Sequence, residues 1–345
     1  MAKFFLGANS EKGFYSLYDD FCADKGDYLH LIKAGPGCGK SGFMRRIGEK
    51  AEELGFDVEY ILCSGDPDSL DGIYIPKLKV GYADATAPHA LEPRHFSADS
   101  DYVNLGQFCS SPPLEDVEKY MTKYKLYYKR AYSLLHGAGA LKSADYPEFI
   151  GNTELIRVKQ RARNAVNRSL GNAVGSGLVK KRFIHCISCL GEVVLTDTVD
   201  ALCKQVYLLD NRFGLAKHYL QAVVDEAAKR KDDIIICPSP LLPTVPEAVI
   251  FPAQQVGFIS SDIYSTDIPY RHVRLDALIP SDKYRAFKSE IKKAEKIYDC
   301  IIESACSNLA EAKRWHDELE NVYKPYIDFT ALDEFTNKEI KKLFA

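Results

Sequence analysis

The chain has 345 residues, a length that predicts about two domains, and its 46% of apolar residues are enough for a sizeable core. A formal net charge of −3 excludes a general attraction to nucleic acid or an anionic membrane, so we expect neither as a partner. Ten cysteines are too few for a disulfide scaffold, and no apolar stretch approaches the roughly 20 residues of a membrane helix. We expect a cytoplasmic protein without a signal peptide.

The first strong local pattern joins a strand to a helix through glycines. Tyr28–Lys33 is a short run typical of a buried parallel strand, and the sequence from Ser41 has helical periodicity until Gly55. Between them lies the stretch AGPGCGKSG, with Ala34 where a phosphate-binding loop usually has its first glycine. Strand, glycine loop and helix are the context of such a loop, although a plain glycine turn capping a helix is the alternative.

The loop and the first helical turn supply the residues that we expect to bind ATP. They are Gly35, Pro36, Gly37, Cys38, Gly39, Lys40, Ser41 and Gly42. The glycines let successive N–H groups point at phosphate oxygens, at the positive end of the helix dipole. Lys40 is expected to reach the β- and γ-phosphates, and Ser41 to ligate Mg²⁺. Oxidation or alkylation of Cys38 could block the loop.

Carboxylates follow the next predicted strand, Val58–Leu62. Asp66, Asp68 and Asp71 lie in the stretch CSGDPDSLDG, at the carboxyl edge where α/β folds bind their ligands. In a P-loop kinase such acids hold the acceptor hydroxyl or act as its base. The alternative is turn chemistry, because Asp-Pro and Asp-Gly favour turns by themselves.

A further acid follows the strand in LKVGYADATAPH. Asp84 ends that strand and is expected to hold the Mg²⁺ shell, with an ordinary strand-end aspartate as the alternative. His89 lies either near the γ-phosphate or in the packing of the loop. Two later helical stretches, Leu114–Leu141 and Ser281–Asn321, are expected to pair in an antiparallel manner, within the chain or against a partner.

Two other features favour structural interpretations. The stretch from Ile156 to Leu190 contains eight basic residues and no acid, which is most typical of a solvated helix face, with a nucleic-acid or phosphate patch as the alternative. Cys186 and Cys189 have the spacing of a metal or redox site, but no second pair completes a zinc site.

An internal repeat divides the chain. Placed without a gap beneath Leu29–Glu53, the stretch Val206–Arg230 aligns strand, turn and helix. In this alignment Gly214 matches Gly37 and Lys217 matches Lys40. Ala216 replaces Gly39, and His218 replaces Ser41. We therefore predict a domain at 1–180 with a helical insert at about 114–172, and a degenerate copy at 181–345 with a helical extension at about 281–345.

Several motifs together resemble a known family. GFYSLYD, KAGPGCGKS, CSGDPDSLDGIYIP, DATAPH and VNLGQF are similar to those of uncharacterised bacterial tandem P-loop ATPase-like proteins. The resemblance covers nearly the whole chain and implies ATP binding, although members often keep a phosphate loop in both halves. This chain departs from that pattern at Arg212, Ala216 and His218.

The sequence predicts an α/β protein with two duplicated P-loop NTPase-like domains, each with a parallel sheet and a helical extension. Its first domain is expected to be an Mg²⁺-dependent ATPase, with Lys40, Asp84, Asp66 and Asp68 as catalytic residues and Ser41 and Asp84 at the metal. The alternatives are a small-molecule kinase and a nucleotide-gated binding protein without turnover.

Overall fold

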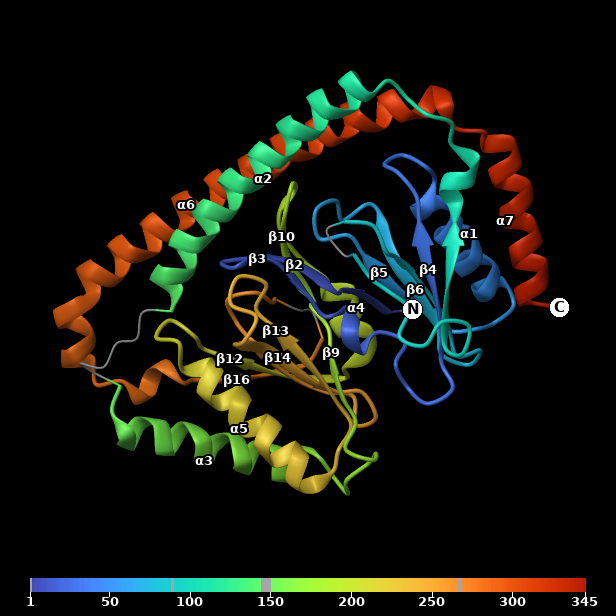
Figure 1. The fold of residues 1–345 in the computed structure, drawn as a ribbon. Helices are drawn as coiled ribbons and strands as arrows, with labels where there is room; N and C mark the ends of the chain where they lie inside the picture. The colour runs from blue at the N-terminus through green and yellow to red at the C-terminus, as the bar shows by residue number, and fades with distance from the viewer. Residues whose placement is uncertain (1, 88–89, 144–149, 266–267) are drawn as a thin grey trace.

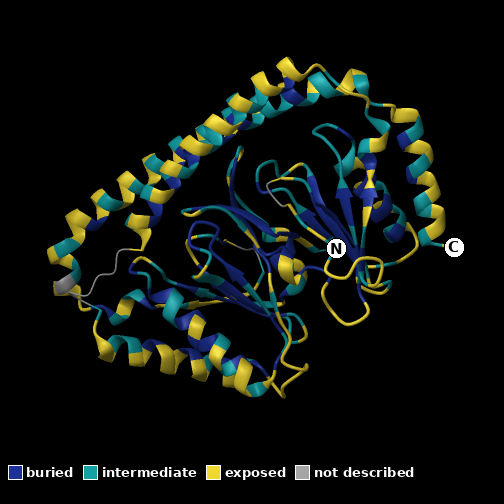
Figure 2. Ribbon diagram, viewed as in Figure 1, coloured by how far each residue is buried: buried dark blue, intermediate teal, exposed yellow. Residues whose placement is uncertain are grey.

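Two six-stranded sheets form the body of the molecule, and a long helical hairpin arches over both (Figure 1). The computed structural model describes residues 2–87, 90–143, 150–265 and 268–345. The central strands of both sheets are largely dark blue in Figure 2 because most of their residues are buried, whereas the outer helices are exposed along one side. The fold is therefore mixed α/β, in agreement with the prediction at that level.

The first sheet has the strand order β1-β5-β6-β7-β4-β8. Their bounds are β1 Ala2–Phe5, β4 Tyr28–Lys33, β5 Glu59–Leu62, β6 Leu70–Ile75, β7 Val80–Asp84 and β8 Ser100–Asn104. All neighbours are parallel except β6, which runs antiparallel to β5 and β7. The predicted parallel sheet is wrong at this strand, because the connections 63–69 and 76–79 are too short for the crossover that parallel strands require.

The second sheet has the same topology. Read from β9, its order is β9-β13-β14-β15-β12-β16, and β14 is again the antiparallel strand. The bounds are β9 Val179–Lys181, β12 Gln205–Leu209, β13 Ile234–Pro238, β14 Pro246–Phe251, β15 Val256–Ser260 and β16 Tyr270–Val273. Each half also has a small hairpin, β2 (Gly7–Ser10) with β3 (Gly13–Ser16) and β10 (His185–Ser188) with β11 (Gly191–Val194).

The long helices connect the two halves. α1 (Lys40–Glu53) follows β4, and α5 (Leu215–Arg230) follows β12. α2 (Leu114–Lys142) and α6 (Ser281–Tyr323) form the antiparallel hairpin, in which Lys123 lies over Trp315 and Lys142 over Tyr298. α3 (Asn152–Ser169) packs on α5, and α7 (Phe329–Leu343) packs on α1. Each of these two helices therefore packs on the sequence half to which it does not belong.

Smaller elements complete the chain. They are α4 (Thr196–Leu202) and the 3₁₀ turns η1 (Tyr18–Asp20), η2 (Leu105–Phe108), η3 (Asp276–Leu278) and η4 (Lys324–Tyr326). A shared core joins the halves, where the backbones of Phe5 and Phe183 exchange two hydrogen bonds of 2.9 Å. Nearby, Arg182 is 2% exposed, and its Nε lies 2.5 Å from Oε1 of Glu59. The two sequence halves are therefore packed as one body.

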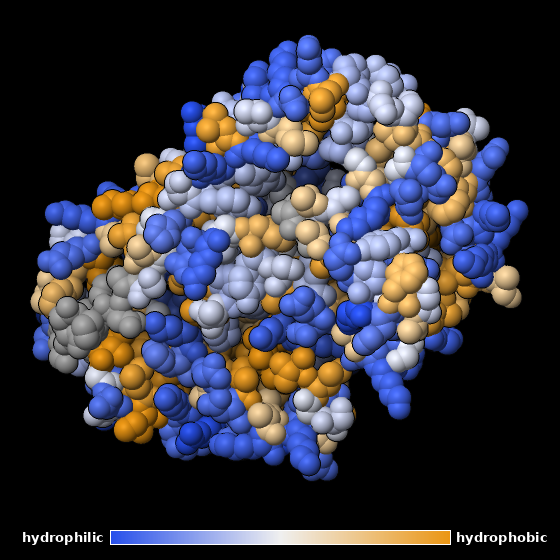
Figure 3. All heavy atoms as spheres, viewed as in Figure 1, coloured by the Kyte–Doolittle hydropathy of each residue, from blue (hydrophilic) through white to orange (hydrophobic). Residues whose placement is uncertain are grey.

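Five of the eight basic residues of the stretch Ile156–Leu190 lie on the exposed side of α3, whereas Lys180 and Lys181 belong to β9 and Arg182 is buried. Val158, Ala162 and Val166 recur every four residues and are buried, while Arg157 and Arg163 are exposed. This is the solvated helix face that the sequence favoured. On the face drawn in Figure 3, hydrophilic side chains predominate and apolar ones lie among them in small groups.

The stability of the second half should depend on pH through His185. Burial lowers the pKa of this imidazole, but the carboxylates of Glu247, at 3.1 Å, and Glu192, at 3.4 Å, outweigh burial and raise it to about 9. A raised pKa in the folded state contributes stability below about pH 6.5 that is lost as the pH rises through about 9. The free energy of unfolding, measured with urea, should fall by about 2–3 kcal/mol across that pH range because of this group. The His185→Gln variant should lack this slope, and an equal slope in both proteins would contradict the assignment.

Candidate functional site

The glycine loop of the first half leads into a helix N-terminus through glycines in the left-handed region. Gly37 and Gly39 have φ values of 69° and 75°, in the left-handed region, and Gly39 is the N-cap of α1. A Cβ at Gly39 would also lie 2.7 Å from Cδ2 of Leu332 in α7, so a side chain there would be both strained and crowded. The loop therefore leads directly into α1, and no side chain of the N-cap residue accepts a hydrogen bond from the first N–H groups of this helix.

Lys40 connects the loop to the predicted metal ligand. Its Nζ donates hydrogen bonds to the carbonyl oxygens of Ala34, at 3.2 Å, and Gly35, at 3.1 Å. The same ammonium lies 3.5 Å from Oδ2 of Asp84. Oδ1 of Asp84 accepts hydrogen bonds from the backbone N–H of Thr86, at 2.8 Å, and from its hydroxyl, at 2.5 Å. A half-buried cation and a buried carboxylate therefore meet at the carboxyl edge of the sheet.

Ser41 is close to the neighbouring strand. Its hydroxyl oxygen accepts a hydrogen bond of 3.0 Å from the backbone N–H of Leu70, the first residue of β6. A hydroxyl that accepts one hydrogen bond keeps a second lone pair for a metal. The serine and Asp84 are both hard oxygen donors, the type that Mg²⁺ prefers.

The three aspartates after β5 have different environments. Asp66 Oδ2 accepts a hydrogen bond of 3.0 Å from the Ser69 hydroxyl and lies 3.5 Å from Nζ of Lys313 in α6. Asp68 is exposed, and its carbonyl oxygen accepts a hydrogen bond from Arg45. Asp71 lies within β6 and is buried, rather than in the loop where the sequence placed it. Of the three, Asp66 is the one that lies against α6.

The last turns of α6 cover the glycine loop. A Cβ on Gly35 would lie 2.9 Å from Cε1 of Tyr323, and a Cβ on Gly37 would lie 3.2 Å from Cβ of Glu320. The sequence predicted no role at the site for these α6 residues. The sequence pattern that could indicate them is a polar stripe on α6, with Lys313, His316 and Glu320 on one helical face. The stripe by itself does not say which loop that face meets.

His316 lies in a mixed electrostatic environment on this stripe. Burial lowers its pKa, Glu320 and Asp317 oppose that effect, and the ammonium groups of Lys40 and Lys313 lower the pKa further. Its donor atom and those of Asp317 and Glu320 lie within 4.8 Å of one another, which is the one such group among the described residues. These side chains thus add polar groups from the second half to the glycine loop of the first.

The corresponding loop of the second half is shorter. Ile32 and Leu209 are equivalent positions, because Ile32 pairs with Asp84 as Leu209 pairs with Ser260. The N-cap Gly39 follows Ile32 by seven positions, whereas the N-cap Gly214 follows Leu209 by only five. The alignment without a gap is therefore wrong beyond the strand. Leu215 and Ala216, rather than Lys217 and His218, begin the helix where Lys40 and Ser41 begin α1.

A side chain caps this shorter loop. Oδ1 of Asn211 accepts a hydrogen bond of 3.1 Å from the backbone N–H of Ala216, in the first turn of α5. An N–H group at a helix N-terminus can bind an anion, and here the asparagine oxygen already accepts its hydrogen bond. Leu215 and Ala216, the first two residues of α5, have neither an amine nor a hydroxyl, unlike Lys40 and Ser41 in α1.

Cys38 and Cys186 have the character of structural thiols. Burial, followed by the neighbouring Cys109, raises the pKa of Cys38 to about 11, so this thiol stays protonated at neutral pH and is a poor nucleophile. Burial likewise raises the pKa of Cys186 to about 12. The structure therefore gives no support to a reactive Cys38. His89 lies outside the described residues.

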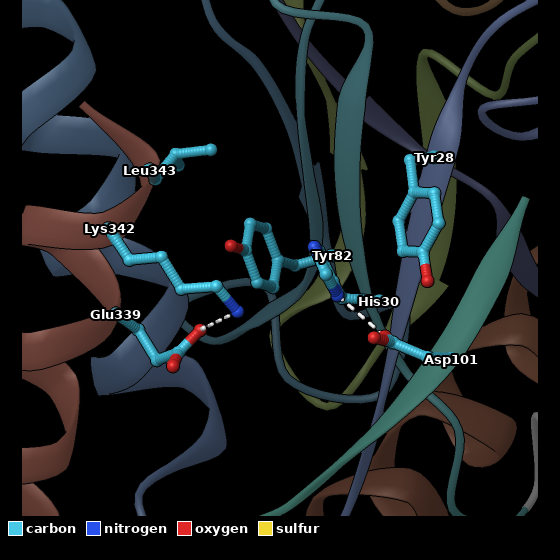
Figure 4. Close-up of a pocket in the computed structure, with 7 residues that line it drawn as sticks. All are labelled: Tyr28, His30, Tyr82, Asp101, Glu339, Lys342 and Leu343. Carbon is cyan, nitrogen blue, oxygen red and sulfur yellow. Dashed lines mark hydrogen bonds and ion pairs between the residues drawn. The ribbon is translucent and has the colours of Figure 1, made fainter. Parts of the chain in front are cut away.

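A pocket of about 320 Å³ lies away from the glycine loop (Figure 4). Tyr28 and His30 of β4 line it, at positions before the end of the strand, together with Tyr82, Asp101 and residues of α7. His30 stacks on Tyr82 and lies 2.6 Å from Asp101. The strand residues that line this pocket lie between the start and the middle of their strands rather than at the carboxyl edge, so the pocket is separate from the glycine loop.

No helix in the described parts of the chain is both long enough and apolar enough to span a membrane. In comparisons with protein families, curated proteins and solved structures, the chain matches none of them.

Proposed function

We propose that the protein is an Mg²⁺-dependent ATPase with one nucleotide site, at the glycine loop of the first half, and a duplicated second half that has lost its site. The observation that carries this proposal is the meeting of Lys40, the left-handed glycines and Asp84 at one sheet edge. The shorter, asparagine-capped loop at Gly214 supports the assignment of the working site to the first half.

The proposed chemistry is mainly positioning and charge stabilisation. Backbone N–H groups of the loop bind the phosphates, and Lys40 exchanges its hydrogen bonds to Ala34 and Gly35 for bonds to phosphate oxygens. Ser41 and Asp84 would hold Mg²⁺, which neutralises charge on the β- and γ-phosphates. Movement of Lys40 toward the phosphates also frees the Asp84 carboxylate for this role.

One observation favours a small-molecule kinase as a second candidate. Asp66 lies on the β5–β6 loop, 3.5 Å from Lys313 of the helix that covers the glycine loop, and its carboxylate could accept the proton of a hydroxyl substrate. Asp68 is exposed and is the weaker candidate for that role. If ATP consumption stays at background until a mixture of small metabolites is added, the kinase replaces the ATPase.

The Asp84→Asn variant tests the proposed function. We expect Mg²⁺-dependent phosphate release to fall about 30-fold, because the amide is a weaker ligand for the metal and its water shell. ATP binding in EDTA should change by less than about threefold, since the loop and Lys40 remain. The matched control is Asp57→Asn, an exposed aspartate after α1, which should keep wild-type turnover.

The outcomes separate the three functions. Equal phosphate release by the wild type and Asp84→Asn would contradict the metal assignment. Binding of ATP by the wild type with no turnover under any condition would favour the nucleotide-gated binding protein. A wild type that binds no ATP would overturn the proposal.

A further inference from the structure

The end of α6 brings a second cation to the proposed nucleotide site. Nζ of Lys313 lies 2.5 Å from Oδ1 of Asp317 on the same helix and 3.5 Å from Oδ2 of Asp66 on the β5–β6 loop. Its side chain is 29% exposed, so the ammonium is neither buried in a core nor free in solvent. Burial lowers the pKa of Lys313, but Asp317 and Asp66 outweigh burial and raise it. The group is therefore an ammonium at neutral pH.

The helix that bears Lys313 is in direct contact with the glycine loop. Glu320 and Tyr323 border Gly37 and Gly35, and Lys313 lies two turns earlier on the same face, about 10 Å along the axis. His316 lies on α6 between Lys313 and Glu320, and the positive charges of both Lys313 and Lys40 lower its pKa. The end of α6 thus adds an ammonium from the second half of the chain to the surroundings of the loop that precedes Lys40.

We propose that Lys313 is a catalytic residue that α6 supplies in cis, and that its ammonium moves from Asp66 and Asp317 to the γ-phosphate when ATP binds. This inference rests on the proposed function, because it requires ATP at the glycine loop. A cation supplied from a second segment is a known way to stabilise the charge that develops in phosphoryl transfer. Asp66 and Asp317 hold Lys313 near that position before the nucleotide arrives.

The hydrolysis step balances without a proton from Lys313. The oxygen of a water molecule forms a bond to the γ-phosphorus, the bond from that phosphorus to the bridging oxygen breaks, and ADP leaves with the electron pair. The proton lost by the water goes to the released phosphate. Lys313 keeps its protons and donates hydrogen bonds to the γ-phosphate oxygens, which gain charge in the transition state.

Lys313→Gln and Lys313→Arg test the inference in the full-length protein. Affinities for ATP and ADP are measured separately by equilibrium binding, with phosphate release measured in parallel. Lys313→Gln should lower the ratio of ATP to ADP affinity about tenfold, because a charge-assisted contact to the γ-phosphate is lost and ADP has none. Turnover should also fall by at least about tenfold. Lys313→Arg should restore both quantities to within about threefold of wild type.

The control is Lys296→Ala, an exposed lysine on the same helix about 26 Å from Lys313, which should leave both quantities unchanged. A merely structural Lys313 would change melting temperature but would leave the ATP-to-ADP ratio intact, and that result would overturn the inference. If the wild type binds ATP and Lys313→Gln keeps the wild-type ATP-to-ADP affinity ratio and turnover, only the catalytic role of Lys313 is contradicted. A wild type that binds no ATP overturns the proposed function together with the inference.

Discussion

Replacement of Lys40 by alanine is expected to abolish phosphate release from Mg²⁺-ATP, with a loss of about 1,000-fold or more. Lys40 is the cation that the loop itself carries, and its Nζ is held at 3.1–3.2 Å from two loop carbonyls. A compact ammonium at this place would contact the β- and γ-phosphates, whose charge alanine leaves uncompensated. The same change leaves Asp84 without its cation, so ATP affinity should fall as well. Phosphate release and equilibrium ATP binding measure the two effects.

The second half supplies the matched control for this variant. Lys217 was aligned with Lys40 in the sequence, but Leu215 begins α5 where Lys40 begins α1. Lys217→Ala should therefore keep ATP affinity within about twofold of wild type. Unchanged phosphate release in Lys40→Ala would remove the glycine loop as the site. A large loss in Lys217→Ala would show that the second half also binds the nucleotide.

Replacement of Arg182 by leucine should destabilise the protein by about 3–5 kcal/mol. Arg182 is 2% exposed, and its Nε lies 2.5 Å from Glu59, so the pair joins the two sequence halves inside the shared core. Its Nη1 also donates a hydrogen bond of 2.9 Å to the carbonyl oxygen of Lys181. Loss of the guanidinium leaves the Glu59 carboxylate without its cation in a largely buried place. The midpoint and slope of urea unfolding measure the change.

Two further variants separate the ion pair from a general effect of the substitution. Arg182→Leu combined with Glu59→Leu should recover at least half of the lost stability, because no charge is then left uncompensated. Arg163→Leu, on the exposed side of α3, should change the free energy of unfolding by less than about 0.5 kcal/mol. Equal stability of Arg182→Leu and the wild type would contradict a role for the pair in joining the halves.

Local features of the chain were predictable in detail. The strand Tyr28–Lys33 has the bounds that its apolar run indicated, and α1 ends just before Gly55, which has a positive φ. Asp84 ends β7 as expected, and α2 and α6 form the predicted antiparallel pair. Periodicity, glycine turns and strand-end polar residues act over a few positions, so they can be recognised without knowledge of the fold.

The errors arose where distant segments or loop lengths decide the structure. Strand direction at β6 follows from the short connections 63–69 and 76–79, which leave no room for a crossover between parallel strands. The shorter loop before Gly214 changed the residues that correspond to Lys40 and Ser41, because one unrecognised gap shifts every later position.

The sequence by itself determined the glycine loop, its flanking strand and helix, and Asp84, because each depends on residues within a short stretch of chain. Only the tertiary structure decided that Glu320 and Tyr323 cover that loop and that Lys313 meets Asp66. These contacts join positions more than 240 residues apart, and they depend on how the α2–α6 pair packs on the small β2–β3 and β10–β11 hairpins. A helical stripe shows which side chains share a face, whereas packing selects the surface that the face meets.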